Sequence, residues 1–191
     1  MSNVTSVMIV GVGGQGTLLA SRLLGSAMMD QGYDVKVSEV HGMSQRGGSV
    51  VTYVRFGDQV YSHIIEQGEA DIILAFEQME AARFLPYLKK GGCVITNTQK
   101  MDPMPVITGA AKYPDTLLES IQAQGAKLVA VDALKLAEQS GSAKAVNVVL
   151  IGAMAKWLGS KPEIWMDTIE KTVPAKFVDM NKKAFNLGYQ A

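Results

Sequence analysis

The segment from Val7 to Gly16 constrains the fold of this 191-residue chain more than any other. Four apolar residues that favour extended structure lead into the turn Gly11-Val12-Gly13-Gly14-Gln15-Gly16, and apolar side chains then recur at helical spacing. This order predicts a strand, a tight turn and a helix that ends near Gly32. The glycines fit the G-x-G-x-x-G pattern, in which backbone N–H groups at a helix N-terminus lie against a phosphate. The alternative is a turn that only packs the helix against the sheet.

Composition excludes several kinds of partner and cofactor. Lysine plus arginine equals aspartate plus glutamate at 18 each, so no net charge favours nucleic acid or a membrane surface as a partner. The single cysteine, Cys93, excludes an internal disulfide and a multi-cysteine metal cage, and we expect it to lie in a strand as a small apolar residue. No export signal is evident, and the longest apolar run is too short to span a bilayer. These features predict a cytoplasmic protein.

An acidic residue follows the glycine turn near the end of the next predicted strand, Asp34 to His41. In a dinucleotide-binding fold, an acidic residue about 20 positions after the glycines accepts hydrogen bonds from ribose hydroxyls. Glu39 comes a few residues late for that role. The alternative is that the Glu39 carboxylate pairs locally with His41 or Arg46.

The loop from His41 to Ser49 is the second unusual stretch, because it combines three glycines with several hydrogen-bond donors. A loop of this composition can close over an anionic group, to which an arginine offers two parallel N–H donors. The candidate residues are Ser44, Gln45, Arg46 and Gly47. The alternative is an ordinary surface loop, since such loops are generally polar and glycine-rich.

The remaining pattern predicts an α/β fold. Val50–Phe56 and Val60–Ile65 are predicted to form a hairpin that turns at Gly57-Asp58, which interrupts regular βαβ winding. The later elements are predicted as a central strand at Asp71–Phe76, a helix at Glu77–Leu88 ended by Gly91-Gly92, a strand at Cys93–Thr98, an edge strand at Val106-Ile107, a helix at Thr116–Gln124, a strand at Lys127–Val131 and a helix at Asp132–Gln139. We therefore predict a Rossmann-like three-layer sandwich, with a mostly parallel sheet, an inserted β-hairpin and a helical C-terminal third, as one domain over residues 1–191.

The C-terminal third contains a helix pattern at Ala143–Leu158 that is apolar on nearly every face. Such a helix is either central or covered by another chain, and in the second case the isolated chain is expected to self-associate. Asn147 within it must find a hydrogen-bond partner if it is buried, and we favour a bridge to a neighbouring backbone over a ligand contact. Two further helices are predicted at Pro162–Thr172 and Pro174–Leu187, the last ended by Gly188.

The chain lacks the motifs of a self-sufficient enzyme. It has no G-x-S-x-G elbow, no lysine at P-loop spacing, no H-E-x-x-H, no C-x-x-C and no thiamine-diphosphate signature. From the residues alone we predict an α/β domain with a crevice suited to phosphate. Two further classes stay open at this point: a stand-alone NAD(P)- or flavin-binding Rossmann oxidoreductase, and a non-catalytic nucleotide-binding regulatory protein.

Two motifs carry a resemblance to a known family. The turn Gly11-Val12-Gly13-Gly14-Gln15-Gly16, together with Glu39-Val40-His41-Gly42-Met43-Ser44-Gln45-Arg46-Gly47-Gly48-Ser49, resembles the gamma subunit of the 2-oxoacid:ferredoxin oxidoreductases. The second block is similar to the small (beta) subunit of the indolepyruvate branch. The resemblance covers essentially the whole chain.

This resemblance implies a subunit of an enzyme that oxidatively decarboxylates a 2-oxo acid with coenzyme A, giving acyl-CoA, carbon dioxide and reduced ferredoxin. It implies that thiamine diphosphate, Mg²⁺ and 4Fe-4S clusters sit on a large partner subunit, and that this chain is inactive alone and holds no catalytic residue. Coenzyme A is the one cofactor that this chain is expected to contact, through Gly11, Gly13, Gly14, Gln15 and Gly16. Ser44, Gln45, Arg46 and Gly47 are expected to contact an anion or the partner.

Overall fold

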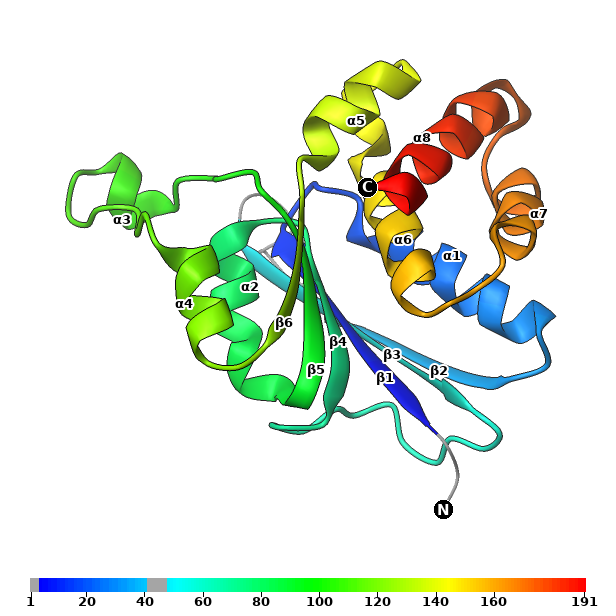
Figure 1. Ribbon diagram of the computed structural model, residues 1–191, viewed down its shortest axis with the longest axis horizontal. Helices are drawn as coiled ribbons and strands as arrows, with labels where there is room; N and C mark the ends of the chain where they lie inside the picture. Colours follow the sequence, from blue (N-terminus) through cyan, green and yellow to red (C-terminus); the bar gives the residue numbers. More distant parts are fainter. Residues whose placement is uncertain (1–3, 41–47) are drawn as a thin grey trace.

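The computed structural model describes residues 4–40 and 48–191, and its centre is a single β-sheet (Figure 1). Within those residues the sheet has six strands in the order β2-β3-β1-β4-β5-β6. The strands are β1 Thr5–Val12, β2 Asp34–Val40, β3 Ser49–Gly57, β4 Ala70–Ala75, β5 Leu88–Asn97 and β6 Lys127–Val131. The strand-turn-helix prediction is confirmed at the N-terminus, where α1 (Thr17–Asp30) follows β1 and Gly32 has a φ of 86°.

Strand β3 makes this sheet irregular. The pairs β1–β4, β4–β5 and β5–β6 are parallel, whereas β3 runs antiparallel to both of its neighbours, β1 and β2. Two antiparallel steps leave β2 parallel to β1, so the carboxyl ends of five strands meet at one edge. The prediction of a mostly parallel but interrupted sheet is confirmed.

The predicted hairpin is only half right, because Val60–Ile65 is not a strand. Both edges of β3 are already occupied, by β1 and by β2, so no edge is left for a strand formed by this segment. The segment instead crosses the amino-terminal edge of the sheet and buries Val60 and Ile65. Arg55 holds it there by donating from Nη1 to the carbonyl oxygen of Ile64 at 2.6 Å.

Helices cover both faces of the sheet and produce three layers (Figure 1). Besides α1 they are α2 Gln78–Phe84, α4 Leu117–Ala123, α5 Ala133–Ser140, α6 Val146–Trp157, α7 Pro162–Thr172 and α8 Val178–Gln190, with short 3₁₀ turns η2 Leu85–Tyr87, η3 Ala143–Ala145 and η4 Ala175–Phe177. The one-turn helix α3 Met104–Ile107 lies away from the sheet (Figure 1). Val7 and Ile9 of β1 face the layer that contains α1 and α6, while Met8 and Val10 face α2 and α4. This alternation follows from the two-residue period of a strand. The three-layer prediction is confirmed.

Helix α6 is central, which decides between the two interpretations of its apolar pattern. All its residues from Val146 to Ala155 are buried, and they are covered by this chain's own elements. The argument for self-association from an uncovered α6 therefore loses its basis. Within the described residues no helix, α6 included, has the length and apolar content needed to cross a membrane.

Three further predictions of local structure are wrong. Helix α2 ends at Phe84, well before Gly91, because Pro86 cannot continue an α-helix. The 3₁₀ turn η2 follows, and β5 begins at Leu88. The predicted edge strand at Val106-Ile107 is part of the one-turn helix α3. Helix α8 runs through Gly188 to Gln190, because Gly188 lies where α6 passes.

Candidate functional site

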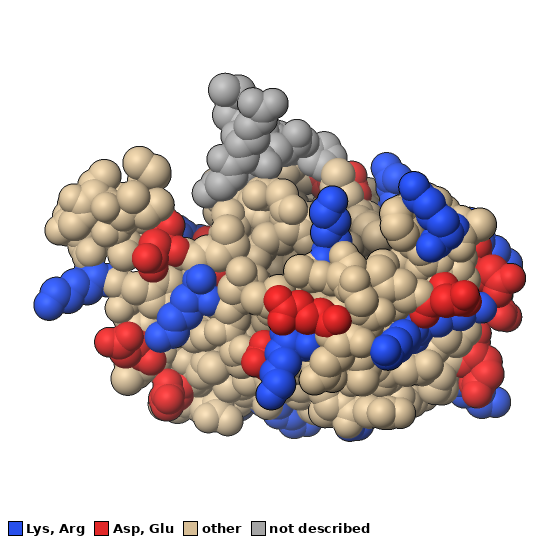
Figure 2. Space-filling view, turned by 90° about the horizontal axis from the view of Figure 1, so that it is seen from above, with Lys and Arg blue, Asp and Glu red and all other residues tan. Residues whose placement is uncertain are grey.

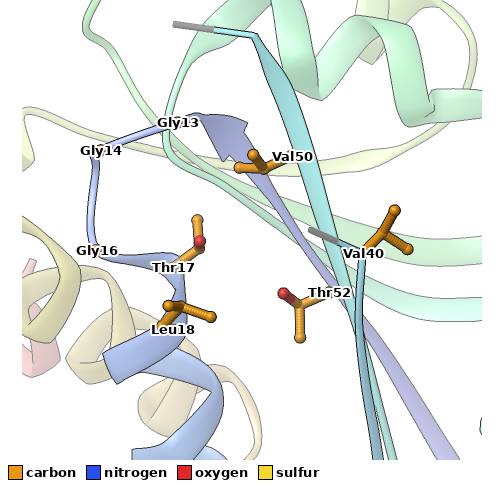
Figure 3. Close-up of a pocket in the computed structure, with 8 residues that line it drawn as sticks. All are labelled: Gly13, Gly14, Gly16, Thr17, Leu18, Val40, Val50 and Thr52. Atoms are coloured by element: carbon orange, nitrogen blue, oxygen red, sulfur yellow. The ribbon is translucent and has the colours of Figure 1, made fainter. Parts of the chain in front are cut away.

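The glycine turn lies at the carboxyl edge of the sheet, between β1 and α1 (Figure 3). Gly14 and Gly16 have φ values of 97° and 85°, a backbone region that favours glycine. Gly16 is the N-cap of α1, where no side chain caps the helix and no acidic residue lies in the first turn. First-turn N–H groups have no carbonyl partner within a helix, and the helix dipole is positive at this end. The turn therefore suits an anion.

Two of the glycines lie against side chains that a Cβ atom would displace. A Cβ atom on Gly11 would lie 2.8 Å from Oε1 of Gln15 and 3.0 Å from Cβ of Phe76. A Cβ atom on Gly16 would lie 2.8 Å from Nδ2 of Asn147. A Cβ atom on Gly14 would meet no atom within 4 Å, so the surface of the turn is open there.

Gln15 braces the turn from inside the protein. Its Oε1 accepts a hydrogen bond from the backbone N–H of Val12 at 2.7 Å, and its Nε2 donates to the carbonyl oxygen of Phe76 at 3.2 Å. Nε2 also lies 3.2 Å from Sδ of Met101. Both ends of the Gln15 amide are thus used within the chain, so Gln15 sets the shape of the turn and ties it to the ends of β1 and β4.

Asn147 ties the turn to the C-terminal helices. Its Nδ2 donates to the carbonyl oxygen of Gly16 at 3.3 Å, and its Oδ1 accepts from the backbone N–H of Val148 at 2.9 Å. This is the backbone bridge that the sequence favours over a ligand contact. It joins residues that are 131 positions apart, so α6 helps to hold the N-terminus of α1 in place.

Two hollows flank the glycine turn and share Gly13, Gly14 and Gly16. The smaller, of about 310 Å³, lies on the side of β2 and β3, and its polar side chains are the hydroxyls of Thr17 and Thr52 (Figure 3). The larger hollow, of about 580 Å³, has polar groups from Gln15, Gln99 and Lys144. Its apolar wall includes Met101, Leu134 and Val146.

The larger hollow fits a phosphate-bearing organic molecule better than a metal or a cluster. Lys144 is exposed and adds a positive charge to the N-terminus of α1. Cys93, the only thiol, is fully buried, and burial raises its pKa to about 12, so it does not supply a thiolate ligand. In residues 4–40 and 48–191, no group of three histidine, cysteine or acidic residues is placed to hold a metal ion.

The second candidate set, Ser44, Gln45, Arg46 and Gly47, lies outside the described residues, as does His41. The described end of that loop does reach the glycine turn, because the backbone N–H of Gly13 donates to the carbonyl oxygen of Gly48 at 2.9 Å.

The carboxylate of Glu39 accepts a hydrogen bond from Oγ of Ser21 at 2.8 Å, which connects β2 to α1.

The charged side chains of the described residues are of mixed sign on the face seen from above the carboxyl edge (Figure 2). Lys and Arg are interspersed there with Asp and Glu, and the described residues form no large field of one sign.

Sequence reasoning missed the contacts that the buried carboxylate of Glu77 makes beside the turn. Glu77, 1% exposed, caps α2 by accepting from the backbone N–H of Glu80 at 3.0 Å. It also accepts hydrogen bonds from the backbone N–H of Met101 at 3.2 Å and from the hydroxyl of Tyr113. Burial, followed by the bond to Glu77, raises the pKa of Tyr113. No local signal connects Tyr113 to Glu77, because 36 residues separate them.

Comparison with known proteins assigns the chain to a family. Residues 6–191 match the family described as pyruvate ferredoxin/flavodoxin oxidoreductase. The chain belongs to this family. It is 49% identical to indolepyruvate oxidoreductase subunit IorB of Pyrococcus horikoshii, over 97% of this chain and 95% of that one. It is 28% identical to the pyruvate/ketoisovalerate oxidoreductases common subunit gamma of Thermococcus kodakarensis, over 91% and 89%. The resemblance inferred from the two motifs is confirmed.

Two solved structures of oxidoreductases have the same fold. Pyruvate oxidoreductase subunit PORC from Thermotoga maritima superposes with a TM-score of 0.76 at 22% identity, over 98% of this chain and 96% of that one. The 2-oxoglutarate:ferredoxin oxidoreductase from Magnetococcus marinus, solved with 2-oxoglutarate, coenzyme A and succinyl-CoA bound, superposes with a TM-score of 0.73 at 17% identity. That match covers 98% of this chain but only 30% of the other, so the same fold also occurs within a longer polypeptide.

Proposed function

We propose that this chain is the gamma-type subunit of an indolepyruvate:ferredoxin oxidoreductase, folded as a single domain over residues 1–191 and located in the cytoplasm. The complex would convert an aryl 2-oxo acid, coenzyme A and oxidised ferredoxin into an acyl-CoA, carbon dioxide and reduced ferredoxin. The observation that carries this proposal is the 49% identity to an indolepyruvate oxidoreductase subunit along almost the whole of both chains. No specific observation favours the stand-alone oxidoreductase or the regulatory protein over it.

The proposal assigns thiamine diphosphate, Mg²⁺ and the 4Fe-4S clusters to a large partner subunit. A 4Fe-4S cluster is held by four cysteine thiolates, whereas this chain contains one cysteine. When bound to the partner, these groups supply the decarboxylation and the electron transfer to ferredoxin. The role left to this chain is to bind and orient a substrate and to complete the wall of the site.

Coenzyme A is the ligand that we assign to the glycine turn. The backbone at Gly13, Gly14 and Gly16, with the positive end of α1 and the ammonium group of Lys144, suits the phosphate groups of coenzyme A. The apolar wall beside them suits the organic part of the molecule. Gly11 and Gln15 would act by shaping the turn, and Ser44, Gln45, Arg46 and Gly47 keep their proposed contact with an anion or the partner.

The test is reconstitution of the enzyme from separately purified chains. We expect coenzyme A-dependent reduction of ferredoxin only when this chain and its large partner are combined, with indolepyruvate preferred over pyruvate and 2-oxoisovalerate. Turnover by the isolated chain, or a redox-active group retained by it, would overturn the proposal.

A charge reversal then tests the coenzyme A assignment. Lys144→Glu should raise the KM for coenzyme A by about tenfold or more, because a phosphate would lose a charge-assisted contact. Lys135→Glu, on the neighbouring helix α5 and outside the hollow, is the matched control and should leave this KM unchanged. Arg46→Ala should lower the activity of the assembled complex, and an unchanged dependence on coenzyme A would remove Arg46 from the site.

A further inference from the structure

The segment 98–116 between β5 and α4, here called the arm, extends away from the body of the protein (Figure 1). None of its residues is buried. Its outermost part, Pro103–Ala111, is here called the tip and includes α3. The tip contains no charged residue, and Met104 and Ile107 within it are each 66% exposed. In the space-filling view the tip forms an uncharged knob at the side of the molecule (Figure 2).

The base of the arm is fixed at both ends to one buried carboxylate. Glu77 accepts a hydrogen bond from the backbone N–H of Met101, where the arm leaves, and from the hydroxyl of Tyr113, where it returns. Lys100 and Asp115 form an ion pair of 3.6 Å across the same base, and the Lys100 ammonium lies 5.5 Å from the centre of the Tyr113 ring. The outward position of the arm is therefore specified by the fold.

The tip also has an ordered backbone of its own. The N–H groups of Val106 and Thr108 donate to the carbonyl oxygens of Pro103 and Met104, each at 2.9 Å, and Ala111 donates to Pro105 at 2.9 Å. Proline at two positions further limits its backbone freedom. A knob that is ordered before binding loses little conformational entropy when it enters a groove. Met104 and Ile107 are three residues apart in α3, so they lie on one side of it and form one exposed apolar surface on this knob.

We propose that the tip docks into an apolar groove on the large partner polypeptide of the same enzyme, with Met104 and Ile107 as its anchors. This inference rests on the proposed function. The inference adds to the proposed function the surface through which this chain binds its partner.

The geometry favours the partner over a second copy of this chain. The tip alone is too small for a stable interface, which needs about 20–30 residues a side, so it must form one part of a larger contact. A partner that also covers the glycine turn would supply the rest of that area. Met101 at the base of the arm also lines the larger hollow and contacts Gln15, so a partner held by the tip would lie beside the glycine turn. The Magnetococcus marinus enzyme provides a parallel, since there this fold is joined to a much longer polypeptide.

The test measures the affinity of the full chain for its purified partner. Met104→Asp combined with Ile107→Asp should weaken binding by about 100-fold or more, because a carboxylate would have to enter an apolar groove. Its circular dichroism spectrum and Tm should match the wild type, since neither side chain is part of the core. Tyr61→Asp is the matched control, because Tyr61 is 83% exposed in the segment at the opposite edge of the sheet, and it should bind as the wild type does.

The outcomes separate this inference from the proposed function. If the wild-type complex forms and oxidises 2-oxo acids while the double variant binds within about threefold of the wild-type affinity, only the docking inference fails. It also fails if the isolated wild-type chain is a dimer that the double variant dissociates, since the tip would then bind a second copy. If the wild-type chain forms no active complex with the partner, the proposed function fails and the docking inference with it.

Discussion

Helices α6 and α8 cross so closely at Gly152 and Gly188 that a single methyl group should separate them. A Cβ atom on Gly188 would lie 1.9 Å from the carbonyl oxygen of Val149 and 2.7 Å from its carbonyl carbon. A Cβ atom on Gly152 would lie 2.2 Å from the carbonyl oxygen of Phe185. These neighbours are backbone atoms, which cannot move aside by a change of rotamer. We therefore predict that Gly188→Ala forces the two helices apart.

The magnitude follows from two opposing terms. Alanine gains about 1 kcal/mol over glycine in the interior of a helix. Restoring ordinary contact at Val149 would require a shift of roughly 1.5 Å in a close-packed interior, and overpacking of this kind costs about 3 kcal/mol or more. The net loss in the free energy of unfolding is about 2 kcal/mol, which lowers the Tm of a protein of this size by about 4–8 °C.

The assay is thermal and urea denaturation of Gly188→Ala beside Gly25→Ala. Gly25 is also a glycine inside a helix, but a Cβ atom there would meet Cγ2 of Val37 at 3.6 Å, which is ordinary contact. Gly25→Ala should therefore gain about 0.5–1 kcal/mol from helix propensity alone. Equal stabilisation by both substitutions would refute the close crossing of α6 and α8.

Three further predictions test the site and its surroundings. Gln15→Leu should lower the free energy of unfolding by about 1–3 kcal/mol, since the N–H of Val12 and the carbonyl of Phe76 lose their partner, and urea denaturation would measure this loss. The pKa of Tyr113 is raised, so the stability contributed by its neutral hydroxyl is present in full below the ordinary value of 10.0 and is lost as the pH rises through the folded pKa. An ultraviolet titration of Tyr113→Phe, subtracted from that of the wild type, isolates the ionisation of Tyr113. This ionisation should occur at a higher pH than that of free tyrosine, and ionisation near pH 10 would contradict the bond to Glu77. Cys93 should resist alkylation at pH 8 in the folded protein and react after unfolding, because burial raises its pKa to about 12, and rapid labelling of the native chain would contradict that burial.

The sequence predicts those parts of the fold that local patterns determine. The strand, glycine turn and helix at the N-terminus follow from the change of period at Gly11, and α7 begins at Pro162 and ends at Thr172 as predicted, because proline is favoured in a first helical turn. The errors come from tertiary contacts. Val60–Ile65 has residues that favour strands, but no free edge of β3 is left to pair with it. Gly188 has the character of a helix stop, but its missing side chain is needed for the crossing with α6.

The candidate site likewise has features that follow from local sequence and features that depend on contacts between distant residues. The turn from Gly11 to Gly16 was recognisable because its glycines are close in sequence, whereas the bridge from Asn147 joins residues 131 positions apart and was predicted only in kind. The cluster of Glu77, Met101 and Tyr113 depends on the path of the arm, which no short pattern encodes. The assignment of the glycine turn to coenzyme A stays a prediction.

The shared carboxylate at the base of the arm also makes the arm a place where the chain can change in length. Because Glu77 holds the residues on both sides together, we expect added or deleted residues in between to alter neither the strand before the arm nor the helix after it. The entropy cost of a longer closed loop grows slowly, by about 0.6 kcal/mol for each doubling of its length. We therefore expect a change in the length of this segment to leave the geometry of the sheet and of the glycine turn intact.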